Sequence, residues 1–198
     1  GYFGDAPISF GNIVLNMGVT TANSNSGTIT ANAATATAGG IVGQVDVLYN
    51  PTHTIKNLTN TGSVTGAGAT AGVGGIIGII NHVSSSATYN LTSLYSNTGT
   101  ITGTTGYTGG LIGFVSQGTG LTLTMTSCKS SSPISVGASA TGTGGLIGEI
   151  VAGAAAQNNS ATTTITKSWS TSTISAASAT NVGGLIGYYL CQQDVTHT

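Results

Sequence analysis

The chain has 198 residues, with three Lys, four acidic residues, no Arg and a formal net charge of −1. Charged residues make up 4% of it, against about 25% in an ordinary soluble domain. Because phosphate binding requires clustered Lys and Arg, we expect no nucleic-acid partner. A polybasic membrane patch and a charged coiled coil are excluded for the same reason. The hydrophobic content of 39% does not fit ordinary disorder either.

The lengths of the apolar segments and the number of cysteines exclude further classes of protein. The apolar runs fall far short of the ~20 residues that span a bilayer, so we expect no membrane span. Two cysteines do not make a disulfide framework. The sequence starts at Gly1 without a signal segment, so we expect a processed chain or a piece of a longer one.

A repeat organises the whole sequence. The pentapeptide Gly-Gly-[Ile/Leu]-[Ile/Val]-Gly occurs five times, at spacings of 35, 35, 35 and 39 residues. Adjacent glycines permit positive φ and close backbone approach, so each pair is predicted to form a tight corner that leads into a buried strand. The predicted corner glycines are Gly39, Gly40, Gly74, Gly75, Gly109, Gly110, Gly144, Gly145, Gly183 and Gly184.

Two strand-like triplets precede most of these corners. Each alternates polar, apolar and polar residues, which is typical of a strand with one buried face. The upstream triplets are centred on Ile55, Leu91, Met125 and Ile165. The downstream triplets are centred on Ile29, Val64, Ile101, Ile134 and Ile174. Turn sequences such as Asn60-Thr61-Gly62 lie between the two sets.

The pattern predicts an all-β fold, a right-handed β-solenoid (β-helix) of about five coils with some 35 residues and three short strands per coil. Like side chains would stack at roughly 4.8 Å from coil to coil. The whole chain is expected to form one repeat domain. The expected coils are 8–43, 44–78, 79–113, 114–148 and 149–187, followed by a partial coil or inter-subunit tail at 188–198.

The combination of Asn-Thr-Gly-[Thr/Ser]-[Ile/Val]-Thr with a following Gly-Gly-[Leu/Ile]-[Ile/Val]-Gly resembles the GLUG-motif repeats of bacterial and protist surface proteins. The resemblance is most specific at 109–113, 144–148 and 183–187. It implies a β-solenoid on an adhesin-like protein at the cell surface. The family often carries an aromatic residue or Cys before its strand, a column that here would hold Leu58, Tyr95, Cys128 and, offset by one, Trp169.

The ionisable residues do not converge in the repeat. The acids include Asp46 and Glu149, which fall at different positions of their coils, and no nucleophile elbow accompanies the histidines. We therefore expect no catalytic, cofactor or metal site, and a protein that is not an enzyme. A calcium-binding roll and a nucleotide loop are excluded because their ligands are absent from the repeat.

Two kinds of modification are predicted. Cys128 is expected to point inward as a small apolar residue. The alternative is an intersubunit disulfide formed by Cys128 or Cys191. Three sequons make Asn57, Asn90 and Asn158 glycosylation candidates, and attached sugar would help to keep a nearly uncharged surface in solution.

No polar cap is evident at either end of the repeat, although solenoids normally need one. We therefore predict an extracellular or cell-surface structural or adhesive protein, which forms a homopolymer by head-to-tail stacking into a fibre or stalk. The alternative is a solenoid that binds ice or carbohydrate with its outward Thr/Ser ladders. Lys56, Asn90, Pro133 and Ser135 interrupt those ladders.

Overall fold

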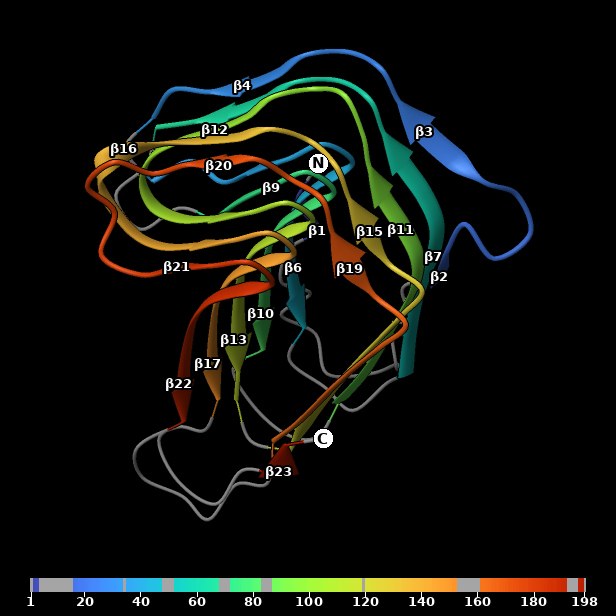
Figure 1. Cartoon of the computed structure of the whole chain (residues 1–198). Helices are drawn as coiled ribbons and strands as arrows, with labels where there is room; N and C mark the ends of the chain where they lie inside the picture. The colour runs from blue at the N-terminus through green and yellow to red at the C-terminus, as the bar shows by residue number, and fades with distance from the viewer. Residues whose placement is uncertain are drawn as a thin grey trace.

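The computed structural model describes residues 2–3, 16–33, 35–47, 52–67, 72–82, 87–118, 120–152, 161–191 and 196–197. Within these ranges the regular secondary structure is β-strand only. The strands form three sheets in which all pairings are parallel (Figure 1). We call them sheets A, B and C.

Sheet A has six strands. They are β1 (Tyr2–Phe3), β6 (Val42–Val47), β10 (Ile77–His82), β13 (Ile112–Gln117), β17 (Ile147–Ala152) and β22 (Ile186–Cys191). Sheet B has nine strands. They are β2 (Asn16–Met17), β3 (Asn23–Asn25), β7 (Thr52–Asn60), β11 (Ala87–Ser96), β14 (Leu121–Thr126), β15 (Lys129–Ser130), β18 (Thr162–Thr166), β19 (Trp169–Ser170) and β23 (Thr196–His197).

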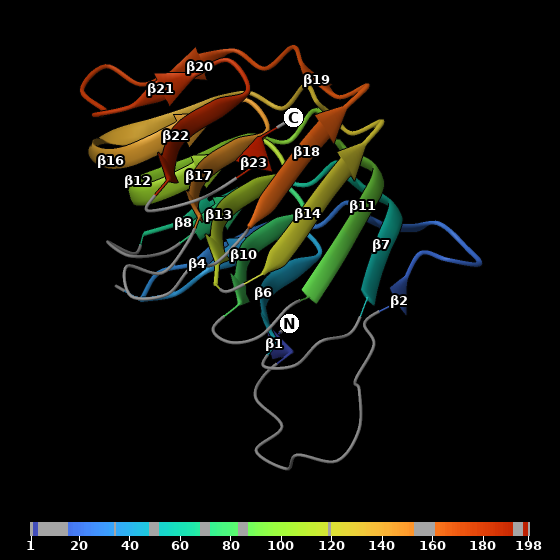
Figure 2. The same ribbon diagram turned by 90° about the horizontal axis from the view of Figure 1, so that it is seen from below.

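Sheet C has eight strands. They are β4 (Ile29–Ala31), β5 (Ala38–Gly39), β8 (Val64–Gly66), β9 (Gly72–Gly74), β12 (Ile101–Gly109), β16 (Ile134–Gly144), β20 (Ile174–Ser175) and β21 (Val182–Gly183). Each turn of the chain passes through sheets B, C and A in that order. Figures 1 and 2 together show that the turns are right-handed, so the expected parallel β-solenoid is confirmed.

The repeat fixes the register of the stack. The first corner glycines pair in one continuous row, because Gly39 pairs with Gly74, Gly74 with Gly109, Gly109 with Gly144, and Gly144 with Gly183. The centres of the upstream triplets pair in the same way in sheet B. Those of the downstream triplets pair in sheet C. Identical positions of the repeat therefore form axial columns, as predicted.

Sheet C folds back on itself, which the sequence did not predict. The first half of β12 pairs with β8, and its second half pairs with β9. β16 pairs in the same way with β20 and β21. The return layer runs beneath the outgoing layer to the glycine corner (Figure 1). We call the folded part of sheet C the arm.

The arm divides the interior into two cores. The larger core lies between sheets A and B and contains columns such as Ile77, Ile112 and Ile147, which are fully buried. The smaller core lies inside the arm. It consists of Ala38, Val64, Val73, Ile101 and Ile134. In each core, one coil completes the apolar surface of the next.

The corner glycines are required for space and not for φ. Gly18, Gly106 and Gly120 are the described glycines with positive φ, and none of them belongs to a corner pair. A Cβ on Gly110 would overlap the Ser130 side chain and the backbone of the next coil. The equivalent residues Gly40, Gly75 and Gly145 meet Asn60, Ser96 and Ser170 in the same way. Of the two properties that suit glycine to a corner, close backbone approach is the one that these corners use.

Positive φ occurs elsewhere, in a column that contains no glycine. Asn57, Ser93, Ser127 and Lys167 have φ values of 54, 54, 55 and 49°. They lie at equivalent positions of sheet B, where they bend the strand before it reaches sheet C. Because of this bend, the inward side chain that follows Ser93 is Leu94 and not Tyr95.

Candidate functional site

The outer face of sheet B carries columns of threonine. Figure 2 shows β7, β11, β14 and β18 side by side. Their polar positions alternate with buried apolar ones, so every second side chain points outward. The first column is Thr52, Thr88, Thr122 and Thr162. The second is Thr54, Asn90, Thr124 and Thr164. The third is Lys56, Thr92, Thr126 and Thr166.

This face is a regular array of hydroxyl and methyl groups. Columns are separated by about 6.6 Å along the strand, and successive coils by about 4.8 Å. Neighbouring hydroxyls come within hydrogen-bond distance, as between Thr126 Oγ1 and Thr166 Oγ1 at 3.2 Å. Asn90 and Lys56 are the interruptions that the sequence predicted on this face. Ser135 lies instead on β16 of sheet C, and Pro133 directly precedes that strand.

A lysine and two aromatic residues border this array. Tyr95, Lys129 and Trp169 form one axial column. Trp169 is the single tryptophan of the chain and is 46% exposed. The sequence placed Tyr95 in a column with Leu58 and Cys128, which was wrong, whereas Trp169 lies one residue beyond that column, as the expected offset has it.

The positive-φ bend explains the correct assignment. The inward column after the bend contains Leu58, Leu94 and Cys128, all fully buried. In the last coil, Ser168 follows Cys128 in this position, and its Oγ accepts a hydrogen bond from the Cys128 backbone N–H.

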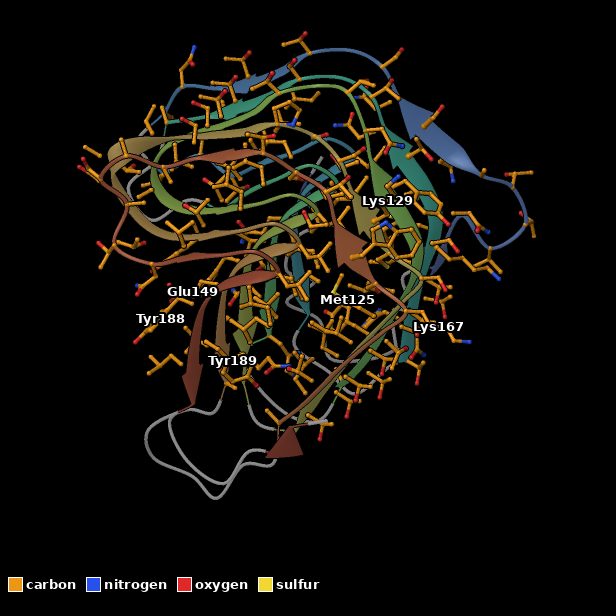
Figure 3. The ribbon with its side chains drawn as sticks, viewed as in Figure 1. Met125, Lys129, Glu149, Lys167, Tyr188 and Tyr189 are labelled. Carbon is orange, nitrogen blue, oxygen red and sulfur yellow. The ribbon has the colours of Figure 1, made fainter. Side chains whose placement is uncertain are left out.

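The described carboxylates lie on the opposite side, on sheet A. Asp46 accepts hydrogen bonds from Gln44 at 2.8 Å and from Asn81 at 2.9 Å. Glu149 is 5% exposed and stands between Phe114 and Tyr188 in one column. Burial raises the pKa of Glu149 to about 7. Figure 3 shows Glu149 and Tyr188 on sheet A, across the molecule from Lys167.

Several polar side chains lie together within the larger core, near the turn from sheet A to sheet B. The His53 and Tyr89 rings pack with their centroids 4.6 Å apart. Burial, and next the neighbouring His82, lower the pKa of His53 to about 4. Nearby, Gln117 Nε2 donates to Thr163 Oγ1 at 3.0 Å. Across the described part of the chain, no three His, Cys, Asp or Glu side chains come together as a metal site.

Cys128 is fully buried, and burial raises the pKa of its thiol. A bond from Cys128 to another chain would need the core to open. Cys191 lies at the end of β22, in a different sheet. The intersubunit disulfide through Cys128 or Cys191 stays a prediction.

The sequons fall at different places in the fold. Asn57 is exposed at the positive-φ bend, and its Nδ2 donates to the Gly18 carbonyl at 3.0 Å. Asn90 stands in the second threonine column. Asn158 lies outside the described residues. Glycosylation at Asn57, Asn90 and Asn158 stays a prediction that intact mass would test.

The last coil exposes apolar side chains at positions that are buried in the coils before it. Leu111 and Leu146 are fully buried, whereas Leu185 is 45% exposed. Val182 is 51% exposed and Tyr188 36% exposed. A Cβ on Gly184 would meet no atom within 4 Å, while one on Gly145 would overlap the Gly184 carbonyl. The stack is thus open at this coil.

The fold and these surfaces define a parallel β-solenoid protein. No family model and no curated protein matches the chain. Its structure is similar to the 1.30 Å crystal structure of a "putative immunoglobulin A1 protease" from Bacteroides ovatus, with a TM-score of 0.56 and 17% identity. The likeness covers 85% of this chain and 49% of that chain, so this chain spans about half the length of its structural relative.

This likeness supports the fold and corrects one expectation. The resemblance to GLUG-motif repeats holds at the level of the β-solenoid. The expectation that the protein is not an enzyme is contradicted, because the protein with the similar solenoid is named as a protease. Within the described residues, no helix is long and apolar enough to cross a bilayer.

Proposed function

We propose that this chain is a rod-forming module of an extracellular or cell-surface protein, and that it lengthens by stacking a second copy on its last coil. The open row at Leu185 supports this proposal most directly. In the three coils before it the same row is closed by a neighbour, and there Ile76, Leu111 and Leu146 are fully buried. Burying Leu185, Val182 and Tyr188 would remove apolar surface from water, which favours association.

The backbone supplies a direction for stacking. At each corner, N–H groups donate to a carbonyl of the following coil, as Leu146 N and Ile147 N do to the Leu185 carbonyl at 2.8 and 3.0 Å. The same geometry directs the Leu185 and Ile186 N–H groups toward the place of a further coil. A coil of the same repeat would offer the matching carbonyl. Low net charge would offer little repulsion to such contacts.

The proposed rod is compatible with more than one parent protein. The GLUG-like repeat suggests an adhesin-like surface protein, and we propose membership of that family on the repeat alone. The Bacteroides ovatus protein is named as a protease, so a solenoid of this kind could equally carry a catalytic domain. In both settings the module would act as a spacer and scaffold.

The experiment compares Leu185→Lys with Thr126→Lys. The first places a charge on the open coil, and the second places the same charge on the side of the solenoid. We expect particles that lengthen with protein concentration in sedimentation velocity and negative stain for the wild type and Thr126→Lys, and monomers for Leu185→Lys. Monomers in all three proteins at high concentration would contradict stacking.

A second candidate function is ligand binding by the threonine array. The observation in its favour is the set of in-register columns on sheet B, which present hydroxyl groups at regular intervals. Ice and carbohydrate are the two ligands that such an array suggests. Thermal hysteresis measurements would test ice, with Thr124→Tyr as the variant that interrupts the middle of the array. A wild type without ice shaping would remove ice from consideration.

A further inference from the structure

We propose that the outer face of sheet B binds an acidic polysaccharide, with Lys129 and Lys167 contacting its anionic groups and Trp169 stacking on a sugar ring. This inference rests on the ligand-binding face named above as the second candidate function, and it specifies the class of ligand. Stacking on the last coil is tested by a different experiment, the comparison of Leu185→Lys with Thr126→Lys.

The charged residues that the structure describes are divided between two sheets. All three lysines belong to sheet B: Lys56 in the third threonine column, Lys129 on β15, and Lys167 at the positive-φ bend. The described acids Asp46 and Glu149 both lie on sheet A. Figure 3 shows Lys129 and Lys167 on the far side of the molecule from Glu149. The sheet B face is therefore positive within the described residues, although the net charge is −1.

Aromatic rings stand beside this charge. Lys129 pairs with Tyr95 of the coil below and Trp169 of the coil above. The two aromatic residues are therefore about 9.6 Å apart along the axis, twice the strand spacing. A large indole that is 46% exposed leaves an apolar surface in water. The apolar face of a pyranose ring would cover it, while an acidic group of the same sugar reaches Lys129.

The threonine columns extend this contact into a track. Each hydroxyl can donate and accept hydrogen bonds, which suits the many hydroxyls of a polysaccharide. The array repeats at every coil, so a repeating ligand can make the same contact several times and gain affinity from linkage. Lys56 lies two coils below Lys129, toward the other end of this track. A ligand lying along the axis would pass from one lysine to the other.

The lysine count distinguishes an acidic polysaccharide from nucleic acid. Nucleic-acid affinity depends on neutralising many phosphates, which three lysines without arginine cannot do. A polysaccharide with one carboxylate per sugar needs fewer cations, because its hydroxyls supply further contacts. The track offers few cations and many hydroxyls, so its composition favours the polysaccharide.

The experiment uses affinity electrophoresis in gels that contain polygalacturonate or its fully methyl-esterified, neutral form. We expect polygalacturonate to retard the wild-type chain, with an effect that declines at high salt, and the neutral form to retard it much less. The double variant Lys129→Gln/Lys167→Gln should bind about 2- to 30-fold more weakly, the effect of two exposed charge contacts. Trp169→Ala should also weaken binding.

Tyr188→Ala is the matched control, because Tyr188 is an exposed aromatic residue of the same coil on sheet A. It should leave binding unchanged, and thermal melting should show that all variants fold. Equal retardation by both polymers would overturn the acidic specificity but leave a ligand-binding face. Equal loss in Tyr188→Ala and Trp169→Ala would overturn the location. Binding to neither polymer would overturn this inference and carbohydrate binding, and stronger binding to single-stranded DNA would overturn the polysaccharide.

Discussion

Replacing Glu149 with glutamine should change how stability depends on pH. Burial raises the pKa of Glu149 from 4.5 to about 7. Burial, followed by His82, lowers the pKa of His53 from 6.5 to about 4. Between pH 4.5 and 6.5 both groups are therefore neutral in the folded chain and charged in the unfolded chain. Each state then holds one proton on this pair, on Glu149 when folded and on His53 when unfolded.

The two groups have opposite effects on the free energy of unfolding. As pH rises through this interval, Glu149 alone would lower it by about 1.4 kcal/mol per pH unit, because only the folded state retains the proton. His53 alone would raise it by the same amount, because only the unfolded state binds the proton. The wild type should thus show little net slope from this pair. The free energy of unfolding of Glu149→Gln should therefore rise by about 2 kcal/mol between pH 4.5 and 6.5.

Urea unfolding at half-unit pH steps, followed by far-ultraviolet circular dichroism, measures both slopes. His53→Leu is the reciprocal variant, because Leu123 occupies the same column of sheet B two coils above. It should lose stability over the same interval. The groups facing the pair, Tyr107 beside Glu149 and His82 and Tyr89 beside His53, remain in place in both variants. A Glu149→Gln curve parallel to the wild-type curve would refute the reasoning.

Three further predictions concern the stack. Gly110→Ala should lower the free energy of unfolding by about 3 kcal/mol, because the new Cβ overlaps a carbonyl and a serine side chain. Gly184→Ala, at the open coil, should change it by no more than about 0.5 kcal/mol, and equal urea midpoints for the two variants would contradict this. Ser93→Gly should gain about 0.5 kcal/mol, since φ of 54° costs serine more than glycine, and a lower melting temperature would count against it. In a Cys191→Ser background, Cys128 should react with a thiol reagent only after unfolding; mass spectrometry that finds rapid labelling of the native chain would disprove its burial.

The stacking register could be predicted because one rule governs it. Residues at a fixed period occupy the same column, so Ile55, Leu91 and Met125 could be placed together from their spacing alone. The turn at Asn60 was also predictable, since an Asn side chain can accept from a backbone N–H two residues on. The structure has this bond between Gly62 N and Asn60 Oδ1 at 3.2 Å.

The remaining features depend on contacts that spacing does not encode. Ser93 adopts positive φ without being glycine, so the change of side-chain direction at Leu94 and Tyr95 had no local signal. The return layer of sheet C consists of Gly, Thr and Ala with few large apolar residues, so its strands lacked the usual alternation. The separation of the described charged residues became visible only once Lys129 had been placed on sheet B and Glu149 on sheet A.

At the first four corners, the second glycine contacts the Asn or Ser across from it, and this narrow contact separates the arm from the main core. Because the arm is separated in this way, its length differs between coils while the row of corner glycines keeps its register. From the sheet C centre to the corner glycine, the chain takes eight steps between Ile101 and Gly109 but ten between Ile134 and Gly144, yet both glycines stay in one row. The arm therefore behaves as a variable appendage on an invariant spine. Insertions at its tip are a route by which otherwise identical turns could acquire different outlines.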